Sequence, residues 1–190
     1  MESLSTQEFT TPEEVATYHR LAQVFQTHIT THRLSFADAR HVGMVLLGEV
    51  WVPWAARRGV SASLGQECSL WLQQRVHARQ DRAVAFVFCS SQAASTAETP
   101  GGRENPETPP DMQLFYILRQ SLREAADQGL LWEGAVAIAL SLLADVLSIP
   151  AQEGRLTLEA TDRLITHGVG PAIEQYVRHH LPESSGRSEV

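Results

Sequence analysis

The stretch Phe36–Val50, FADARHVGMVLLGEV, decides the fold, because it aligns with Trp132–Val146, WEGAVAIALSLLADV, at a shift of 96 positions. An aromatic residue faces an aromatic residue at the start, Leu-Leu faces Leu-Leu further on, and Glu49 faces Asp145 near the end. Such an internal repeat predicts two similar helical halves, related by duplication or by pseudo-symmetry. Two helix pairs rich in Ala and Leu would also align through composition alone, so that alternative stays open.

Capping signals and helical periodicity predict the helices of the first half. Residues 11–14, Thr-Pro-Glu-Glu, combine an N-cap Thr with Pro at the first helical position and Glu at the third. The segment Ser35–Asp38 predicts a second start, and Pro53 is expected to end or kink that helix. A third helix is expected to start at Ser61 or Ser63.

The second half shows the same kinds of signal. It begins near Asp111, and its first helix is expected to stop at Gly129. A buried helix follows over Leu131–Ser148 and is closed by Pro150. Two further helix starts are predicted by a capping Thr and by a Gly-Pro step: Thr157 and Gly170-Pro171.

These signals predict an all-α fold, a bundle of roughly seven or eight helices in two similar halves. The predicted segments are a disordered N-terminus at 1–10, helical half A at 11–90, a flexible linker at 91–110, helical half B at 111–182 and a disordered tail at 183–190. The halves are expected to pack as one domain. Residues 83–89, AVAFVFC, are compatible with a strand or with a short buried helix.

Composition narrows the classes of function. The net charge is −7 and hydrophobic residues make up 43% of the 190 residues. An acidic chain lacks the general attraction to phosphates of a nonspecific nucleic-acid binder. The apolar run Leu130–Ile149 carries Glu133 and Asp145, which favours a buried helix over a membrane span. With an acidic first segment and only two cysteines, we expect a cytoplasmic protein without a membrane partner.

Glu49 and Asp145 are the first candidate site residues, because each lies in the most apolar helix of its half. A pseudo-two-fold axis would bring the carboxylates together, so that they shared a proton or bound a metal. Alternatively, each acid lies near a helix end and reaches solvent or an arginine. The Glu-x-x-His pattern of di-metal carboxylate bundles is missing, so the role of these buried acids stays open.

Three histidines form a second candidate group. His28 and His32 are four residues apart and therefore share one helix face, and His41 lies on the next predicted helix. If the two helices form an antiparallel hairpin, the three side chains could hold a zinc ion with an open fourth position. Ile29 stands where a His-Glu-x-x-His metalloprotease motif has its Glu, so that chemistry is not indicated. Ordinary surface histidines are the alternative, and no cofactor is predicted.

The segment 55–76 resembles the turn of a helix-turn-helix module, in which small residues let two helices cross closely. Candidate DNA contacts in this reading are Arg57, Arg58, Ser61 and Ser63. Three further arginines add local positive charge: Arg75, Arg79 and Arg82. An ordinary helix stop followed by a cap explains the same residues.

No assembled catalytic motif, phosphate loop or nucleophile elbow occurs in the chain. The leading hypothesis is therefore a non-enzymatic helical interaction or regulatory protein, acting through a protein partner or as a homo-oligomer. A DNA-binding regulator using residues 55–76 is the alternative, with nucleic acid possible but not favoured. A small metal-dependent helical enzyme is the second alternative.

Overall fold

The structure, a computed structural model, describes residues 9–58, 63–80 and 108–181. All of its secondary structure in these ranges is helical: α1 Pro12–His32, α2 Phe36–Arg58, α3 Leu64–His77, α4 Pro110–Asp127, α5 Trp132–Gln152, α6 Leu158–Leu164, the π-helical turn η1 Ile165–Val169, and α7 Gly170–His180. Because α6, η1 and α7 follow one another directly, the described part contains six continuous helical stretches. The all-α prediction is confirmed there, and residues 83–89 lie outside the described ranges.

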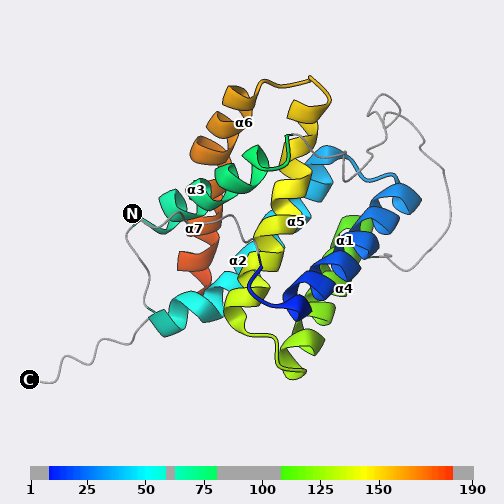
Figure 1. Ribbon diagram of the computed structural model, residues 1–190, viewed down its shortest axis with the longest axis vertical. Helices are drawn as coiled ribbons and strands as arrows, with labels where there is room; N and C mark the ends of the chain where they lie inside the picture. The colour runs from blue at the N-terminus through cyan, green and yellow to red at the C-terminus, as the bar shows by residue number, and fades with distance from the viewer. Residues whose placement is uncertain (1–8, 59–62, 81–107, 182–190) are drawn as a thin grey trace, which may run out of the picture.

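The helices form three layers (Figure 1). Helices α2 and α5 cross in the centre and contact each other along much of their length. Helices α1 and α4 pack together on one side of this pair, and α3, α6 and α7 pack together on the other. Each central helix begins at the residue that the internal alignment pairs with the start of the other, Phe36 and Trp132.

The central position of α5 explains why this helix is apolar on every side. A helix that is hydrophobic all round must be enclosed by other parts of the protein or by a membrane. By length and composition alone α5 would be able to span a membrane, but 89% of its most apolar window is buried inside the protein. The prediction of a buried helix over Leu131–Ser148 is therefore confirmed, with bounds of Trp132 and Gln152.

The helix starts predicted from capping residues are confirmed. The Thr11 hydroxyl accepts from the backbone N–H of Glu14, whose carboxylate accepts in return from the backbone of Thr11. Ser35 and Asp38 make the same reciprocal pair at the start of α2. Two further signals hold: Thr157 accepts from the N–H of Ala160, and Gly129 has a φ of 115° just beyond α4.

The sequence predicts that Pro53 ends or kinks its helix and that Pro150 closes its helix, but neither proline ends a helix. Both prolines lie inside helices, and α2 continues to Arg58. A proline in a helix interior removes one backbone hydrogen bond and costs about 3 kcal/mol. In α2, burial on both sides of the proline offsets that cost, because Trp51 and Ala55 are both completely buried. The Trp51 ring also stacks on Trp71 of α3, with ring centroids 5.6 Å apart.

Helix α7 begins at Gly170, as the Gly-Pro step predicts, but it is continuous with the helix before it. The backbone N–H of Gly170 donates to the carbonyl of Ile165, five residues earlier, and this wider π turn joins α6 to α7 without a break. Gly170 lies so close to α3 that a Cβ atom there would be 2.0 Å from the Ser69 Oγ and 2.6 Å from the Gly65 carbonyl oxygen. The π turn therefore lies where the two helices meet most closely.

The start of α3 is capped from another helix. Ser63 is the N-cap residue, as one of the two predicted starts has it, but its side chain makes no cap hydrogen bond. Instead, the Glu174 carboxylate of α7 accepts from the backbone N–H of Gly65 at 3.0 Å. A carboxylate near a helix N-terminus is favoured by the helix dipole, so α3 and α7 are tied by charge as well as by packing.

Candidate binding groove beside Glu49

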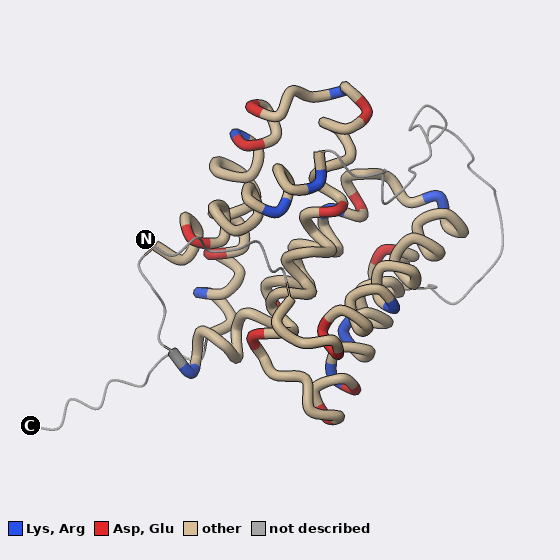
Figure 2. Tube along the Cα trace, in the orientation of Figure 1, with Lys and Arg blue, Asp and Glu red and all other residues tan. Residues whose placement is uncertain are grey.

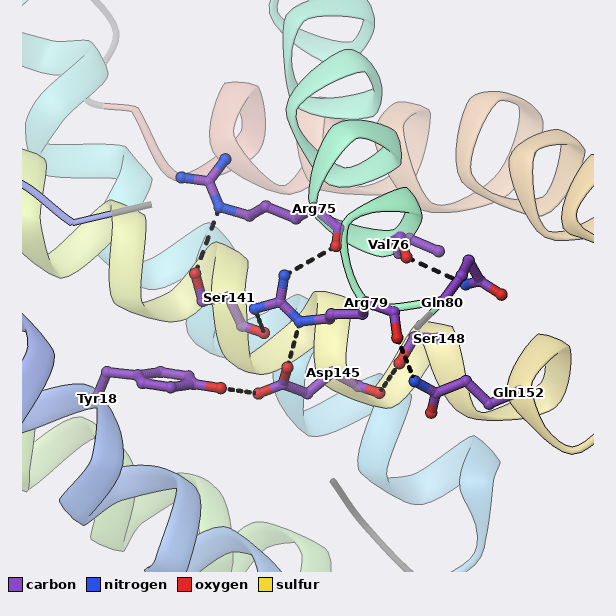
Figure 3. A network of polar contacts seen from close by, with 9 residues as sticks. All are labelled: Tyr18, Arg75, Val76, Arg79, Gln80, Ser141, Asp145, Ser148 and Gln152. Atoms are coloured by element: carbon purple, nitrogen blue, oxygen red, sulfur yellow. Dashed lines mark hydrogen bonds and ion pairs between the residues drawn. The ribbon is translucent and has the colours of Figure 1, made fainter. Parts of the chain in front are cut away.

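Asp145 lies at the centre of a buried polar network on α5 (Figure 3). Its carboxylate forms an ion pair with the Arg79 guanidinium, and the two side chains are only 4% and 2% exposed. The Tyr18 hydroxyl of α1 donates to the other carboxylate oxygen at 2.5 Å. Burial, followed by the charge of Asp145, raises the pKa of the Tyr18 phenol far above its ordinary value. Both carboxylate oxygens of Asp145 are therefore paired inside the protein.

The other hydrogen bonds of Arg79 anchor the end of α3 to α5. Its guanidinium donates to the Arg75 carbonyl at 2.9 Å and to the Ser141 carbonyl at 3.3 Å. Its own backbone carbonyl accepts from Gln152 at 2.6 Å. Figure 3 shows these groups arranged around Arg79. Because each donor has a nearby acceptor, this network serves to hold α1, α3 and α5 together.

Glu49 has the same two kinds of partner in a more open place. The Tyr176 hydroxyl of α7 donates to one carboxylate oxygen at 2.8 Å, and Arg119 of α4 lies 2.9 Å from the other. The side chains of Glu49 and Arg119 are 26% and 33% exposed. Burial, together with the hydrogen bond to Glu49, raises the pKa of Tyr176 to about 12.

The two matched acids are thus not a proton-sharing or metal-binding pair. Each carboxylate has a tyrosine and an arginine of its own, and each pair of partners comes from the first and third helices of the other half. Asp145 is bound by α1 and the end of α3, whereas Glu49 is bound by α4 and α7. Each acid instead pairs with an arginine, which is the alternative that the sequence left open.

A groove with a volume of about 540 Å³ opens beside Glu49, between α2, α4, α5 and the end of α7. Its walls are mainly apolar: Val50, Val52, Pro53, Leu122, Ala126, Trp132 and Ala135. Charged and polar side chains lie along it: Glu49, Arg119, Arg123, Asp127 and His180. Arg57 of α2 lies against one wall residue, because its guanidinium is 5.8 Å from the centre of the Trp132 ring. Apolar walls with a few charged groups are typical of binding sites.

The structure brings together only two of the three candidate metal ligands. The rings of His28 and His32 lie with centroids 4.2 Å apart on α1. Within residues 9–58, 63–80 and 108–181, no group of three or more His, Cys, Asp or Glu side chains could hold a metal ion. The three-histidine site that includes His41 is therefore not assembled.

The structure directs part of the predicted DNA-binding charge inward. Arg79 is buried against Asp145, and Arg75 donates to the Ser141 hydroxyl at 3.3 Å. Arg57 is exposed at the end of α2, and Ser63 donates to Glu67. Ser61 lies outside the described residues, as does the side chain of Arg58. Figure 2 shows that basic residues in the described part are spread over several helices and interspersed with acidic ones.

Sequence reasoning missed the partners of both acids, Tyr18, Arg79, Arg119 and Tyr176. Each tyrosine is 127 residues from the acid that it contacts. Residue patterns within one helix cannot predict a contact between residues so far apart in the sequence. The one available signal was the burial expected for two acids in apolar helices, because a buried carboxylate requires donors.

Comparison of the chain with protein-family models, with curated proteins and with solved structures found no match.

Proposed function

We propose that this chain is a non-enzymatic interaction protein whose groove beside Glu49 binds an apolar segment of a protein partner or of a second copy of the chain. The observation that carries the proposal is the open surroundings of Glu49, compared with the sealed surroundings of Asp145. Two acids with the same kinds of partner differ mainly in that one of them lines a groove of about 540 Å³. Features shared by the two halves build the scaffold, so a feature found in only one half is the better candidate for a function.

The walls of the groove suit a short apolar segment. Trp132 and Val52 offer an aromatic and an aliphatic surface, and aromatic residues in particular anchor protein interfaces. Arg123 is exposed at the rim and is available to pair with a carboxylate of the bound segment. An apolar centre with a charged rim is the usual arrangement of a protein interface.

We also propose that the two halves are structural repeats. Their helices correspond in order, with α1 matching α4, α2 matching α5, and α3 matching the α6–α7 stretch. The contacts have the same correspondence, since α2 packs on α4 and α7 while α5 packs on α1 and α3. On this proposal the central pair is the common scaffold, and the groove is a feature of one side only.

A photoreactive amino acid placed in the groove tests the proposed function. Ala126 lines the groove, and Glu124 is exposed on the same helix outside it. The chain contains no lysine side chains with which amine-reactive crosslinkers could react. A photoreactive residue at position 126 is therefore used instead. We expect a discrete crosslinked species in cells of the native host from position 126 and none from position 124.

A bulky residue that fills the groove is expected to abolish partner binding, which is a second test of the proposed function. Ala126→Trp is expected to remove the crosslinked partner from pull-downs, whereas Glu124→Trp is expected to retain it. Circular dichroism of both variants checks that the helical content is unchanged. If light scattering shows a dimer that Ala126→Trp converts to a monomer, the partner is a second copy. A strict monomer without any crosslink from position 126 would show that the proposal is wrong.

A further inference from the structure

The paired histidines on α1 lie in a shallow hollow that the proposed function does not use. His28 and His32 are four residues apart, and their ring centroids are 4.2 Å apart with a tilt of 35° between the ring planes. The hollow has a volume of about 330 Å³, and polar side chains surround the two rings: Gln23, Thr27 and Thr31. Two imidazoles at this spacing are close enough to bind one ion together.

The hydrogen bond of His28 fixes which ring nitrogen is available to an ion. Its Nε2 lies 2.9 Å from the backbone carbonyl oxygen of Pro110, at the start of α4. A carbonyl oxygen only accepts, so Nε2 carries the proton and the lone pair of the neutral ring lies on Nδ1. Histidine ligands of metals almost always donate their second ring nitrogen in this way, commonly to a backbone carbonyl.

His32 supplies the second ligand of the site. The His32 ring is exposed at the last residue of α1 and is therefore able to rotate toward a shared ion. A tetrahedral Zn²⁺ holds two nitrogens at about 2.0–2.1 Å, which places them about 3.3 Å apart.

We propose that His28 and His32 form a two-histidine site for a divalent transition-metal ion, bound through Nδ1 of His28 and a ring nitrogen of His32. Imidazole ligands suit Zn²⁺ and Cu²⁺, and Cu²⁺ binds more tightly to a given set of nitrogen ligands. Water or a ligand from another molecule fills the remaining positions. This site differs from the predicted three-histidine site because His41 takes no part in it.

Calorimetric titration of the full chain with ZnCl₂ at pH 7.5 tests the proposal. We expect one ion to bind per chain, and His32→Ala to weaken binding by about a hundredfold, because one of two linked ligands is lost. Within the described residues His32 contacts the His28 ring and makes no hydrogen bond, so the fold of His32→Ala is expected to be intact, as thermal unfolding without metal would verify. His19→Ala removes an exposed histidine of the same helix and is expected to leave binding unchanged.

Nitrogen-15 NMR of the histidine rings tests the assignment of the ligand atom. On addition of Zn²⁺ we expect the Nδ1 resonance of His28 to shift while Nε2 keeps its proton. Binding that is unaffected by His32→Ala, or the absence of any binding at millimolar Zn²⁺, would overturn the site. Metal bound to Nε2 of His28 would overturn the proposed geometry.

Discussion

The Asp145 carboxylate shows how much one buried charge matters to this protein. Its arginine partner is 2% exposed, so removing the carboxylate's charge leaves Arg79 buried without a counter-ion. We expect Asp145→Asn to lower the free energy of unfolding by about 3–5 kcal/mol. Chemical denaturation followed by tryptophan fluorescence measures this loss.

Glu49→Gln is the matched control for that change. It removes the same charge from an acid with the same kinds of partner, but Glu49 and Arg119 are 26% and 33% exposed. An ion pair that is partly screened by water contributes roughly 1 kcal/mol or less. Equal losses in the two variants would contradict the difference between the buried and the partly exposed site.

Ionisation of the Tyr176 phenol is expected to lower the free energy of unfolding at alkaline pH. Its pKa of about 12 in the folded protein lies above the ordinary value of 10.0. Its hydrogen bond to Glu49 therefore contributes fully below pH 10, and the contribution is lost as the pH rises from 10 towards 12. We expect the stability difference between the native protein and Tyr176→Phe to be constant up to pH 10 and to shrink above it.

Urea denaturation at a series of pH values measures that difference. Carbon-13 NMR of ring-labelled tyrosine, assigned with Tyr176→Phe, reports the ionisation of the phenol directly. A midpoint near pH 10 for Tyr176 would refute the effect of burial and of Glu49.

At the scale of the elements, the close contact of α3 with α7 depends on Gly170. A Cβ atom at this position would collide with the Ser69 Oγ and with the Gly65 carbonyl oxygen, one of which is backbone. We expect Gly170→Ala to destabilise the protein by about 1–3 kcal/mol, because the helices must move apart. Thermal unfolding and chemical denaturation measure the change.

Gly168→Ala is the control within the same π turn. Gly168 is exposed, and the nearest atom to its Cβ would be Leu164 Cδ1 at 3.6 Å. Replacing a helical glycine with alanine stabilises a helix by up to about 1 kcal/mol. A loss of stability in Gly168→Ala like that in Gly170→Ala would show that the π turn itself, and not the helix contact, is sensitive.

Sequence reasoning was reliable for elements whose ends are set by neighbouring residues. The starts of α1 and α2 follow from capping pairs three residues apart, and the end of α4 follows from the positive φ of Gly129. It could not predict features that depend on packing between distant segments. The continuation of α2 through Pro53 depends on burial against other helices, and the capping of α3 by Glu174 depends on a residue 109 positions away from Gly65.

At the scale of the whole molecule, neither half has its own complete core. The central pair takes α2 from one half and α5 from the other, and each buried acid finds its partners across the boundary. We expect fragments 1–95 and 96–190 to be largely unfolded alone and to recover helical structure when mixed. Circular dichroism of each fragment and of their mixture measures this, and a half that unfolds cooperatively by itself would contradict it.

The candidate site could be predicted only in part from the sequence. The alignment that pairs Glu49 with Asp145 located both acids, but not which of them borders a groove. That difference arises from the packing of α4 and α7 around α2. Side chains from four helices form the groove, and hydrophobic periodicity reports only the face that one helix buries.

The reciprocal pairing of the acids has a consequence for assembly. Glu49 takes its tyrosine and its arginine from the second half, and Asp145 takes both from the first. Two chains that exchanged halves would therefore recreate every one of these contacts in a domain-swapped dimer, with no new interface to be selected. The closed monomer and the swapped pair would share the same interactions, so chain concentration would set the balance between them.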